Sequence, residues 1–198
     1  LTGGSRAGAA SSAIVPPGAI GVSRFLSTCT ACHLCVTRCP TRVLQPSLLS
    51  AGPRGLFQPR LDYHAGRCDF QCNVCSQVCP SGALLPLSLP EKQETRIGTA
   101  EFVLERCVVF TNGTACGACA EICPTGSAHM IPYRGELTIP ALIDELCIGC
   151  GSCEFVCPAA PVRAITVTVV PEHRRLSLAG TTRVQHAEPE KPEEGFAF

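Results

Sequence analysis

The sequence has few of the large side chains that usually fill a protein core. Its 198 residues include no Trp, one Met and two Tyr, and aromatic residues make up only 5%. A small domain with so few bulky side chains buries too little apolar surface to offset the entropy that its backbone loses on folding. We therefore expect something other than an ordinary hydrophobic core to stabilise this protein.

Long apolar runs and an excess of one charge are also absent. A transmembrane helix needs about 20 largely apolar residues, whereas the apolar stretches at residues 13–22 and 164–170 are shorter, and the first is broken by Pro16 and Pro17. Lys and Arg total 16, and so do Asp and Glu. The sequence therefore predicts no transmembrane segment in this chain and no nucleic-acid partner.

Cysteine, in contrast, is abundant, with 16 residues. This density is typical of a disulfide scaffold, of zinc sites or of iron–sulfur clusters. The spacing separates the three, because the cysteines form four repeats that each end in Cys-Pro, at residues 29–40, 68–80, 107–124 and 147–158. Four copies with the same ending indicate one structural unit used four times.

The first and fourth repeats have the spacing C-x2-C-x2-C-x3-C-P. In two-cluster ferredoxins the first three cysteines of such a run bind one [4Fe–4S] cubane, and the fourth binds the neighbouring cubane. The second repeat lengthens the first gap by one residue. The third lengthens it to eight, and Asn112-Gly113 marks a turn in that insertion, so Cys107 is expected to keep its place as a ligand. No cysteine is left over, which predicts four [4Fe–4S] clusters.

The other uses of cysteine fit less well. Zinc sites need two C-x2-C pairs and have no use for a third cysteine at the same interval. Disulfides are hard to form among cysteines placed two residues apart in triplets. Residues 29–33 (CTACH) match the pattern for covalent haem attachment. That choice would leave Cys35 and Cys39 unused, so we expect His33 to lie beside a cluster instead.

The repeats can pair in sequence order or in a nested order. Because the two regular repeats lie outermost and the two lengthened repeats inside, the sequence favours nesting, with the first repeat paired to the fourth and the second to the third. The predicted ligand sets are then Cys29, Cys32, Cys35 and Cys157; Cys147, Cys150, Cys153 and Cys39; Cys68, Cys72, Cys75 and Cys123; and Cys107, Cys116, Cys119 and Cys79. Small residues such as Ala31, Gly149 and Gly151 would let the backbone approach the clusters.

The segments between the repeats predict short strands and short helices, which together indicate an α+β fold that is rich in loops. Residues 101–110 and 164–170 are rich in β-branched and aromatic residues, and the second segment alternates as a half-buried strand does. Residues 171–175 (PEHRR) read as a turn into a second short strand at Leu176–Leu178, with His173, Arg174 and Arg175 at a solvated hairpin tip. A single helical turn is expected near the third cysteine of each repeat.

These expectations give a division into units. Residues 1–20 read as a flexible leader or linker. An outer dicluster unit would combine residues 21–55 with residues 136–170, and an inner dicluster unit would span residues 56–135. Residues 171–198 would form the hairpin and an acidic tail.

The repeats and two flanking segments carry a family resemblance. The order of regular, lengthened, long-gap and regular repeats is similar to that of the four-cluster ferredoxin-type proteins of periplasmic nitrate reductase and methylamine utilisation, the NapG/MauM type. Residues 96–108 (RIGTAEFVLERCV) and residues 140–158, which lead to RAITV, add to the likeness. It covers about residues 16–170 and extends to the electron-transfer subunits of molybdopterin oxidoreductases.

The resemblance implies an electron carrier that connects a membrane quinol-oxidising or cytochrome subunit to a terminal reductase. It also implies a place on the periplasmic side of a bacterial membrane, with the cytoplasm as the alternative. We expect no enzymatic activity, because no phosphate loop, nucleotide fingerprint or catalytic constellation is present and the five histidines are scattered. The alternative is a redox-sensing or maturation protein of a reductase complex. The histidines are His33, His64, His129, His173 and His186.

Overall fold

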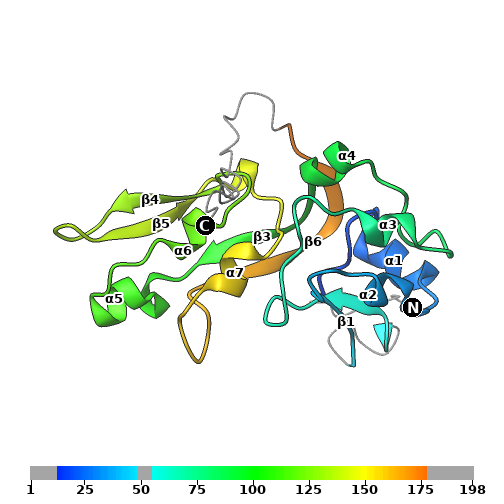
Figure 1. Cartoon of the computed structure of the whole chain (residues 1–198), viewed down its shortest axis with the longest axis horizontal. Helices are drawn as coiled ribbons and strands as arrows, with labels where there is room; N and C mark the ends of the chain where they lie inside the picture. The colour runs from blue at the N-terminus through cyan, green and yellow to red at the C-terminus, as the bar shows by residue number, and fades with distance from the viewer. Residues whose placement is uncertain (1–12, 49–54, 178–198) are drawn as a thin grey trace, which may run out of the picture.

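The computed structural model describes residues 13–48 and 55–177, and it has two ends joined by a central strand pair (Figure 1). One end contains α1 (Val22–Thr28), α2 (Leu34–Thr37), β1 (Leu44–Pro46), β2 (Pro59–Leu61) and α3 (Val74–Gln77). The centre contains α4 (Leu89–Glu94), β3 (Thr95–Phe102), α7 (Ser152–Val156) and β6 (Ile165–Arg175). The other end contains η2 (Leu104–Arg106), α5 (Val108–Asn112), α6 (Ala118–Glu121), β4 (Ala128–Pro132) and β5 (Thr138–Leu142), and η3 (Asp144–Leu146) leads back to the centre.

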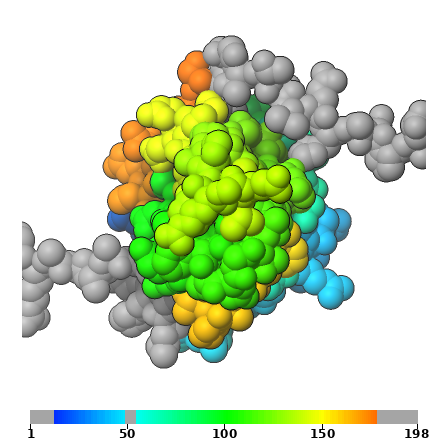
Figure 2. Space-filling view, turned by 90° about the vertical axis from the view of Figure 1, so that its left-hand side faces the viewer, coloured from blue at the N-terminus to red at the C-terminus, as the bar shows by residue number. Residues whose placement is uncertain are grey.

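Among the described residues, the strands form three antiparallel pairs, β1–β2, β3–β6 and β4–β5. The β4–β5 pair lies across the far end of the molecule, which faces the viewer in Figure 2. The expected mixture of short helices and strands is confirmed. None of the helices that the structure describes is long and apolar enough to cross a membrane.

The β3–β6 pair shows where the expected strands were placed wrongly. The strand expected at residues 164–170 is confirmed, but it continues through residues 171–175, so the turn and hairpin tip expected there are wrong. Arg174 lies opposite Arg96 and Arg175 lies opposite Thr95, because β3 begins early enough to pair with this extension. Leu176 and Ser177 are not in a strand, and Leu178 lies outside the described residues.

The segment at residues 101–110 is mostly not a strand. Only Glu101 and Phe102 belong to β3, and η2 and α5 follow. The helical turns expected at the third cysteines are confirmed, since α2, α3, α6 and α7 each contain one of them. Gly113 ends α5 in the left-handed conformation, with φ of 64°, as expected of a turn at Asn112-Gly113.

Residues 13–19 are buried in the core and Ile20 is 53% exposed, so the expectation of a flexible leader is wrong for this ordered segment; residues 1–12 lie outside the described residues. Val15 is 1% exposed and Ile14 is 6% exposed. The Ile14 carbonyl accepts a hydrogen bond from Leu61 N–H at 2.8 Å, and the Gly18 carbonyl accepts one from Leu85 N–H at 2.9 Å. This segment therefore adds an apolar layer to the core, although its small residues and prolines are typical of a linker.

The apolar core is divided into two small clusters, and cysteines belong to both. The first gathers around Phe25, Val15 and Leu84, and the second around Ile165 and Val109. Cys35 is buried in the first cluster, and four cysteines are buried in the second, namely Cys107, Cys147, Cys153 and Cys157. Cysteine side chains therefore occupy positions in both cores, in a chain that has few aromatic side chains to fill them.

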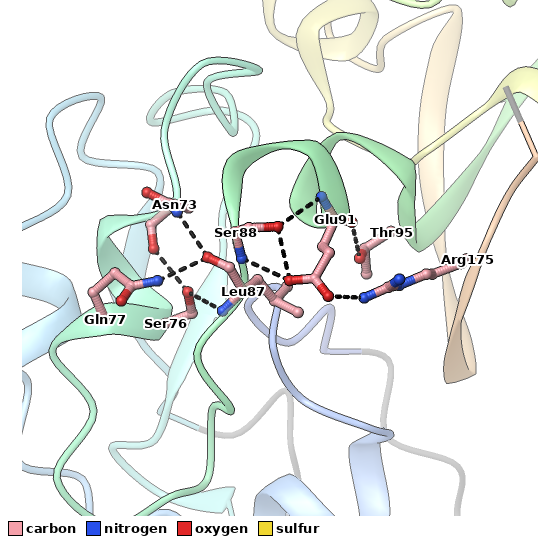
Figure 3. A network of polar contacts seen from close by, with 8 residues as sticks. All are labelled: Asn73, Ser76, Gln77, Leu87, Ser88, Glu91, Thr95 and Arg175. Carbon is pink, nitrogen blue, oxygen red and sulfur yellow. Dashed lines mark hydrogen bonds and ion pairs between the residues drawn. The ribbon is translucent and has the colours of Figure 1, made fainter. Parts of the chain in front are cut away.

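A polar network fastens α3 and α4 to the end of β6 (Figure 3). Asn73 and Gln77 of the α3 region each donate a side-chain hydrogen bond to the Leu87 carbonyl at 2.7 Å. Ser88 and Glu91 form a capping box at the start of α4, and Glu91 also pairs with Arg175. The Ser88 hydrogen bonds, followed by Arg175, lower the pKa of Glu91 to about 2.

Candidate metal centres

The cysteines gather into four sets, three of which line cavities of similar size. A cavity of about 360 Å³ is lined by Cys39, Cys68, Cys72 and Cys75, which we call site B. A cavity of about 350 Å³ is lined by Cys107, Cys116, Cys119 and Cys157, which we call site C. A cavity of about 340 Å³ is lined by Cys123, Cys147, Cys150 and Cys153, which we call site D.

The remaining cysteines, Cys29, Cys32, Cys35 and Cys79, form site A. Burial, followed by the nearby thiolates of Cys29, Cys32 and Cys79, raises the pKa of Cys35 to about 12. Burial also raises the pKa of Cys29, where Cys79 and Cys32 act in the same direction. The four thiols are therefore close enough to repel one another when ionised, which is the environment of a shared cation.

The nested order of repeats is wrong, because each fourth cysteine lies with the triplet of the adjacent repeat in the sequence. The first and second repeats exchange Cys39 and Cys79, and the third and fourth exchange Cys123 and Cys157. The helix contacts explain this order, since α2 packs on α3 and α6 packs on α7. The division into an outer unit of residues 21–55 and 136–170 and an inner unit of residues 56–135 is wrong for the same reason.

The geometry of the sets fits a cluster better than a single ion or disulfides. All 16 cysteines lie in the described residues and are free thiols. Tetrahedral zinc would hold its sulfur ligands about 3.8 Å apart, yet no three His, Cys, Asp or Glu side chains in the described part of the chain converge closely enough to hold one metal ion. Four thiols that surround a cavity match the four corners of a cubane.

Comparisons with known proteins agree with this geometry. Residues 28–84 match a 4Fe-4S dicluster domain, and residues 112–161 match a second 4Fe-4S dicluster domain. The chain is 31% identical over 191 residues to the methylamine utilization ferredoxin-type protein MauM of Methylophilus methylotrophus, a match that covers 91% of this chain and 80% of that protein.

The chain belongs to this family of ferredoxin-type proteins. It is also 33% identical over 156 residues to the ferredoxin-type protein NapG of Escherichia coli K12, with 72% of this chain and 64% of NapG covered. It is 29% identical over 155 residues to NapF of the same organism, with 78% of this chain and 86% of NapF covered. Two dicluster domains give this ferredoxin-type protein four [4Fe–4S] clusters, and both the predicted family and the predicted cofactors are confirmed.

The four sites of this ferredoxin-type chain follow one another in the order A, B, D, C. Burial raises the pKa of Cys75 in site B, and the thiolate of Cys35 in site A contributes to the shift. Burial likewise raises the pKa of Cys153 in site D, with a contribution from Cys119 in site C. Sites B and D meet directly, because Cys68 N–H donates a hydrogen bond to the Cys150 carbonyl at 2.9 Å.

The junction between sites B and D is closed by a tyrosine that the sequence did not single out. Tyr63 is 4% exposed, and its hydroxyl donates a hydrogen bond to the Gly149 carbonyl. A Cβ atom at Gly151 would lie 2.0 Å from the Tyr63 ring, and one at Gly149 would lie 2.4 Å from Gly98 N. The sequence suggested that these two glycines let the backbone approach a cluster. In the structure they let the loop pack closely against Tyr63 and Gly98.

Hydrogen bonds to sulfur are distributed unevenly over the four sites. A hydroxyl two residues after the fourth cysteine contacts sulfur in three repeats, from Thr41 to Cys39, from Ser81 to Cys79 and from Thr125 to Cys123, at 3.5–3.7 Å. The corresponding residue of the fourth repeat is Ala159, which has no hydroxyl.

Backbone N–H groups add to this pattern. Leu84 donates to Cys79, Ala128 donates to Cys123 and Ala100 donates to Cys147, each at 3.4 Å. Burial raises the pKa of Cys79, but the hydrogen bonds from Leu84 and Ser81 outweigh it and bring the pKa below its usual value. Donors of this kind stabilise negative charge on sulfur. In site D they act on Cys123 and Cys147, and hydrogen bonds from Ser152 also oppose the rise in pKa that burial gives Cys150.

Two buried cations lie beside the sites. Lys92 belongs to no motif, and Arg96 is the first residue of the family-like segment at residues 96–108, which does not by itself indicate a contact with a site. Lys92 is 3% exposed, and its Nζ donates to the Asp69 carbonyl and lies 5.9 Å from the centre of the Phe70 ring. Burial raises the pKa of Cys68 and the charge of Lys92 opposes the rise, which leaves the pKa at about 11.

The second cation, Arg96, is 5% exposed. It donates from Nε to the Cys147 carbonyl at 2.9 Å and from a terminal nitrogen to the Asp144 carboxylate at 2.9 Å. Arg96 thereby ties β3 to the start of the site D loop.

His33 lies beside site A, as the sequence predicted. Its Nε2 is 2.7 Å from the Phe57 carbonyl oxygen, so the ring interacts with a backbone carbonyl. Cys35 lies in site A with Cys29 and Cys32, and Cys39 lies in site B, so a haem at Cys29 and Cys32 would displace a cubane ligand. The arrangement favours the cluster over the haem alternative.

Proposed function

We propose that this protein relays electrons through four [4Fe–4S] clusters held in sites A, B, D and C, in that order, and catalyses no substrate reaction of its own. The ligands would be the four cysteines of each site, so that each cluster draws three from one repeat and one from its sequence neighbour. A cubane supplies a one-electron redox centre, and the protein sets its surroundings and its distance from the next cluster.

The observation that carries this proposal is the direct backbone contact between Cys68 of site B and Cys150 of site D. Without it, the chain would hold two separate pairs of clusters. With it, the pair of sites A and B adjoins the pair of sites C and D. The hydrogen bond between Cys68 and Cys150 gives electrons a short path through bonds from one pair to the other. Four centres in line fit conduction between two partners better than storage of charge in one place.

For the partners, we propose a membrane quinol-oxidising or cytochrome subunit at one end and a terminal oxidoreductase at the other. For the compartment, we propose the periplasmic side of a bacterial membrane. The support is family membership together with the names of the relatives, since MauM is named for methylamine utilization and NapG and NapF are named as ferredoxin-type proteins.

The test begins with protein purified without exposure to air. We expect about 16 iron atoms per chain, and EPR spectra of the dithionite-reduced protein that show coupling between neighbouring clusters. The reduced protein should then be reoxidised rapidly and repeatedly by a quinone analogue. Slow turnover combined with a redox-dependent change in partner binding would contradict the relay and favour a sensor or maturation protein. Conversion of a substrate without any added partner would contradict the non-catalytic role.

A further inference from the structure

The first and fourth repeats have the same spacing, so their loops can be compared position by position. Cys32 corresponds to Cys150, and the flanking residues Ala31 and His33 correspond to Gly149 and Gly151. All four flanking residues have positive φ, between 53° and 74°. The two loops therefore share a backbone conformation, and their outer faces are equivalent.

The two equivalent faces differ in what covers them. In the fourth repeat, Tyr63 and Gly98 pack against Gly151 and Gly149, and Cys150 is 8% exposed and contacts site B through its carbonyl. In the first repeat the same face has no such cover among the described residues, and Cys32 is the only exposed cysteine of the 16. The face that passes electrons between the halves in one loop is open to solvent in the other.

Apolar side chains surround the open face. Leu34 is 44% exposed and follows His33 directly, and Phe57 is 50% exposed. The bond between His33 Nε2 and the Phe57 carbonyl holds these two segments together at 2.7 Å. Phe57 itself has a φ of 61°, which costs energy in a residue other than glycine. Exposed apolar side chains held in place around a redox ligand are typical of a docking face.

The charges nearest this face in the sequence are mostly positive. Residues 13–48 contain three arginines and no Asp or Glu, whereas Arg60, in the segment with Phe57, is paired with Asp62. Arg38 and Arg42 are exposed, and neither forms an ion pair with the residues that the structure describes. Residues 101–163, which include the far end, carry seven carboxylates and three arginines. The two ends of the cluster series therefore favour partners of different charge.

We propose that the surface formed by Cys32, His33, Leu34 and Phe57 is the docking face for a redox protein with an acidic surface, which exchanges electrons with the cluster in site A. This inference rests on the proposed function and names the end of the relay at which such a partner binds. Cys32 presents the sulfur, Leu34 and Phe57 supply the apolar contact, and Arg38 and Arg42 supply attraction for carboxylates.

The experiment uses the four-cluster protein and flavodoxin hydroquinone, an acidic electron donor, in a stopped-flow instrument without oxygen. The second-order rate constant is expected to fall at least fivefold as salt rises from 50 to 300 mM, because opposite charges steer the encounter. The double variant Leu34→Glu, Arg38→Glu should react at least tenfold more slowly. The matched double variant at the far end, Ile131→Glu, Arg134→Glu, should change the rate less than twofold.

Three readouts separate docking from other causes. Both double variants should retain about 16 iron atoms, and both should be reduced fully by dithionite. Their rates of reduction by photoreduced deazariboflavin, a small donor that needs no docking face, should match the wild-type rate. Equal rates would show that the substitutions do not alter the driving force for reduction of the clusters. If Leu34→Glu prevents assembly, Leu34→Ser with Arg38→Gln replaces it, with an expected reduction of at least threefold.

Equal slowing by the two double variants, no slowing by either, or a rate that does not respond to salt would overturn the docking face. These results would leave the relay intact as long as the wild-type protein still cycles with a quinone analogue. Failure to exchange electrons with every donor would instead contradict the proposed function itself.

Discussion

The Tyr63 hydroxyl donates a hydrogen bond to the Gly149 carbonyl oxygen at 2.5 Å, which joins residues 86 positions apart. Tyr63 belongs to the half that holds sites A and B, and Gly149 lies in the loop of site D. Burial raises the pKa of Tyr63 well above its usual value, and the charges of Cys68 and Cys150 add to the rise, so the hydroxyl keeps its proton as a donor. This bond and the Cys68–Cys150 hydrogen bond hold the two halves in register.

Replacing this tyrosine tests the junction. In Tyr63→Phe the Gly149 carbonyl loses its donor in a buried site, which should lower the free energy of unfolding by about 1–2 kcal/mol. The looser junction should also slow electron equilibration between the halves, measured by flash photoreduction. Tyr133→Phe is the matched control, since its hydroxyl has no such bond in the described part of the chain. Equal effects of the two substitutions would contradict the special role of Tyr63.

Lys92 should raise the reduction potential of the cluster in site B. A buried positive charge favours the more negative, reduced cluster. We expect Lys92→Met to lower that potential by on the order of 50 mV, seen in an EPR-monitored redox titration. Lys92→Arg keeps the charge and should shift the potential much less. A potential unchanged in Lys92→Met would show that solvent and other charges screen the ammonium group.

Thr125 should tune the cluster in site D through its contact with Cys123 at 3.7 Å. Thr125→Val preserves the shape of the side chain and removes the hydroxyl that stabilises negative charge on the Cys123 sulfur. The reduction potential of the cluster in site D should therefore fall by on the order of 20–50 mV. Thr114→Val, at an exposed position outside the four ligand sets, is the control. A shift of the same size in both variants would rule out a local effect of the hydroxyl.

His173 should make the protein less stable as the pH falls from about 6.5. Burial lowers its pKa to about 4, so between these values the unfolded chain binds a proton that the folded chain excludes. The penalty grows with acidity and reaches about 3 kcal/mol near pH 4. Thermal unfolding followed by cluster absorbance between pH 7 and pH 5 should show a smaller decline for His173→Phe. A decline in His173→Phe that parallels the wild-type decline would contradict the assignment.

The number and type of the clusters were predictable from the sequence. The pairing of the repeats, which decides where each fourth cysteine binds, was not. The spacing within each repeat is a local property, and it correctly predicted four groups with no spare thiol. Which repeat receives Cys39 depends on helix packing, α2 on α3 and α6 on α7. Regular outer repeats and lengthened inner repeats carry no information on that packing, and the lengthening at residues 108–115 is absorbed by α5 without moving Cys107 from its set.

Other differences have the same origin in tertiary contacts. Residues 13–19 look like a linker because they are small and include Pro16 and Pro17, yet they are buried and hydrogen-bonded to Leu61 and Leu85. Residues 171–175 look like a turn, but β3 offers Arg96 and Thr95 as pairing partners. Tyr63 and Lys92 belong to no motif, and the segment that begins at Arg96 does not show what Arg96 contacts, since each of the three acts through buried contacts with a distant part of the chain.

Pairing in sequence order has a consequence for biosynthesis. Every ligand of sites A and B is present once Cys79 has been synthesised, and the ligands of sites C and D follow only with Cys157. Iron insertion can therefore proceed from the amino-terminal half onward while the ribosome is still translating the rest. In a nested chain no cubane would have all four ligands before Cys119, and the cubane that includes Cys29 would have to wait for Cys157.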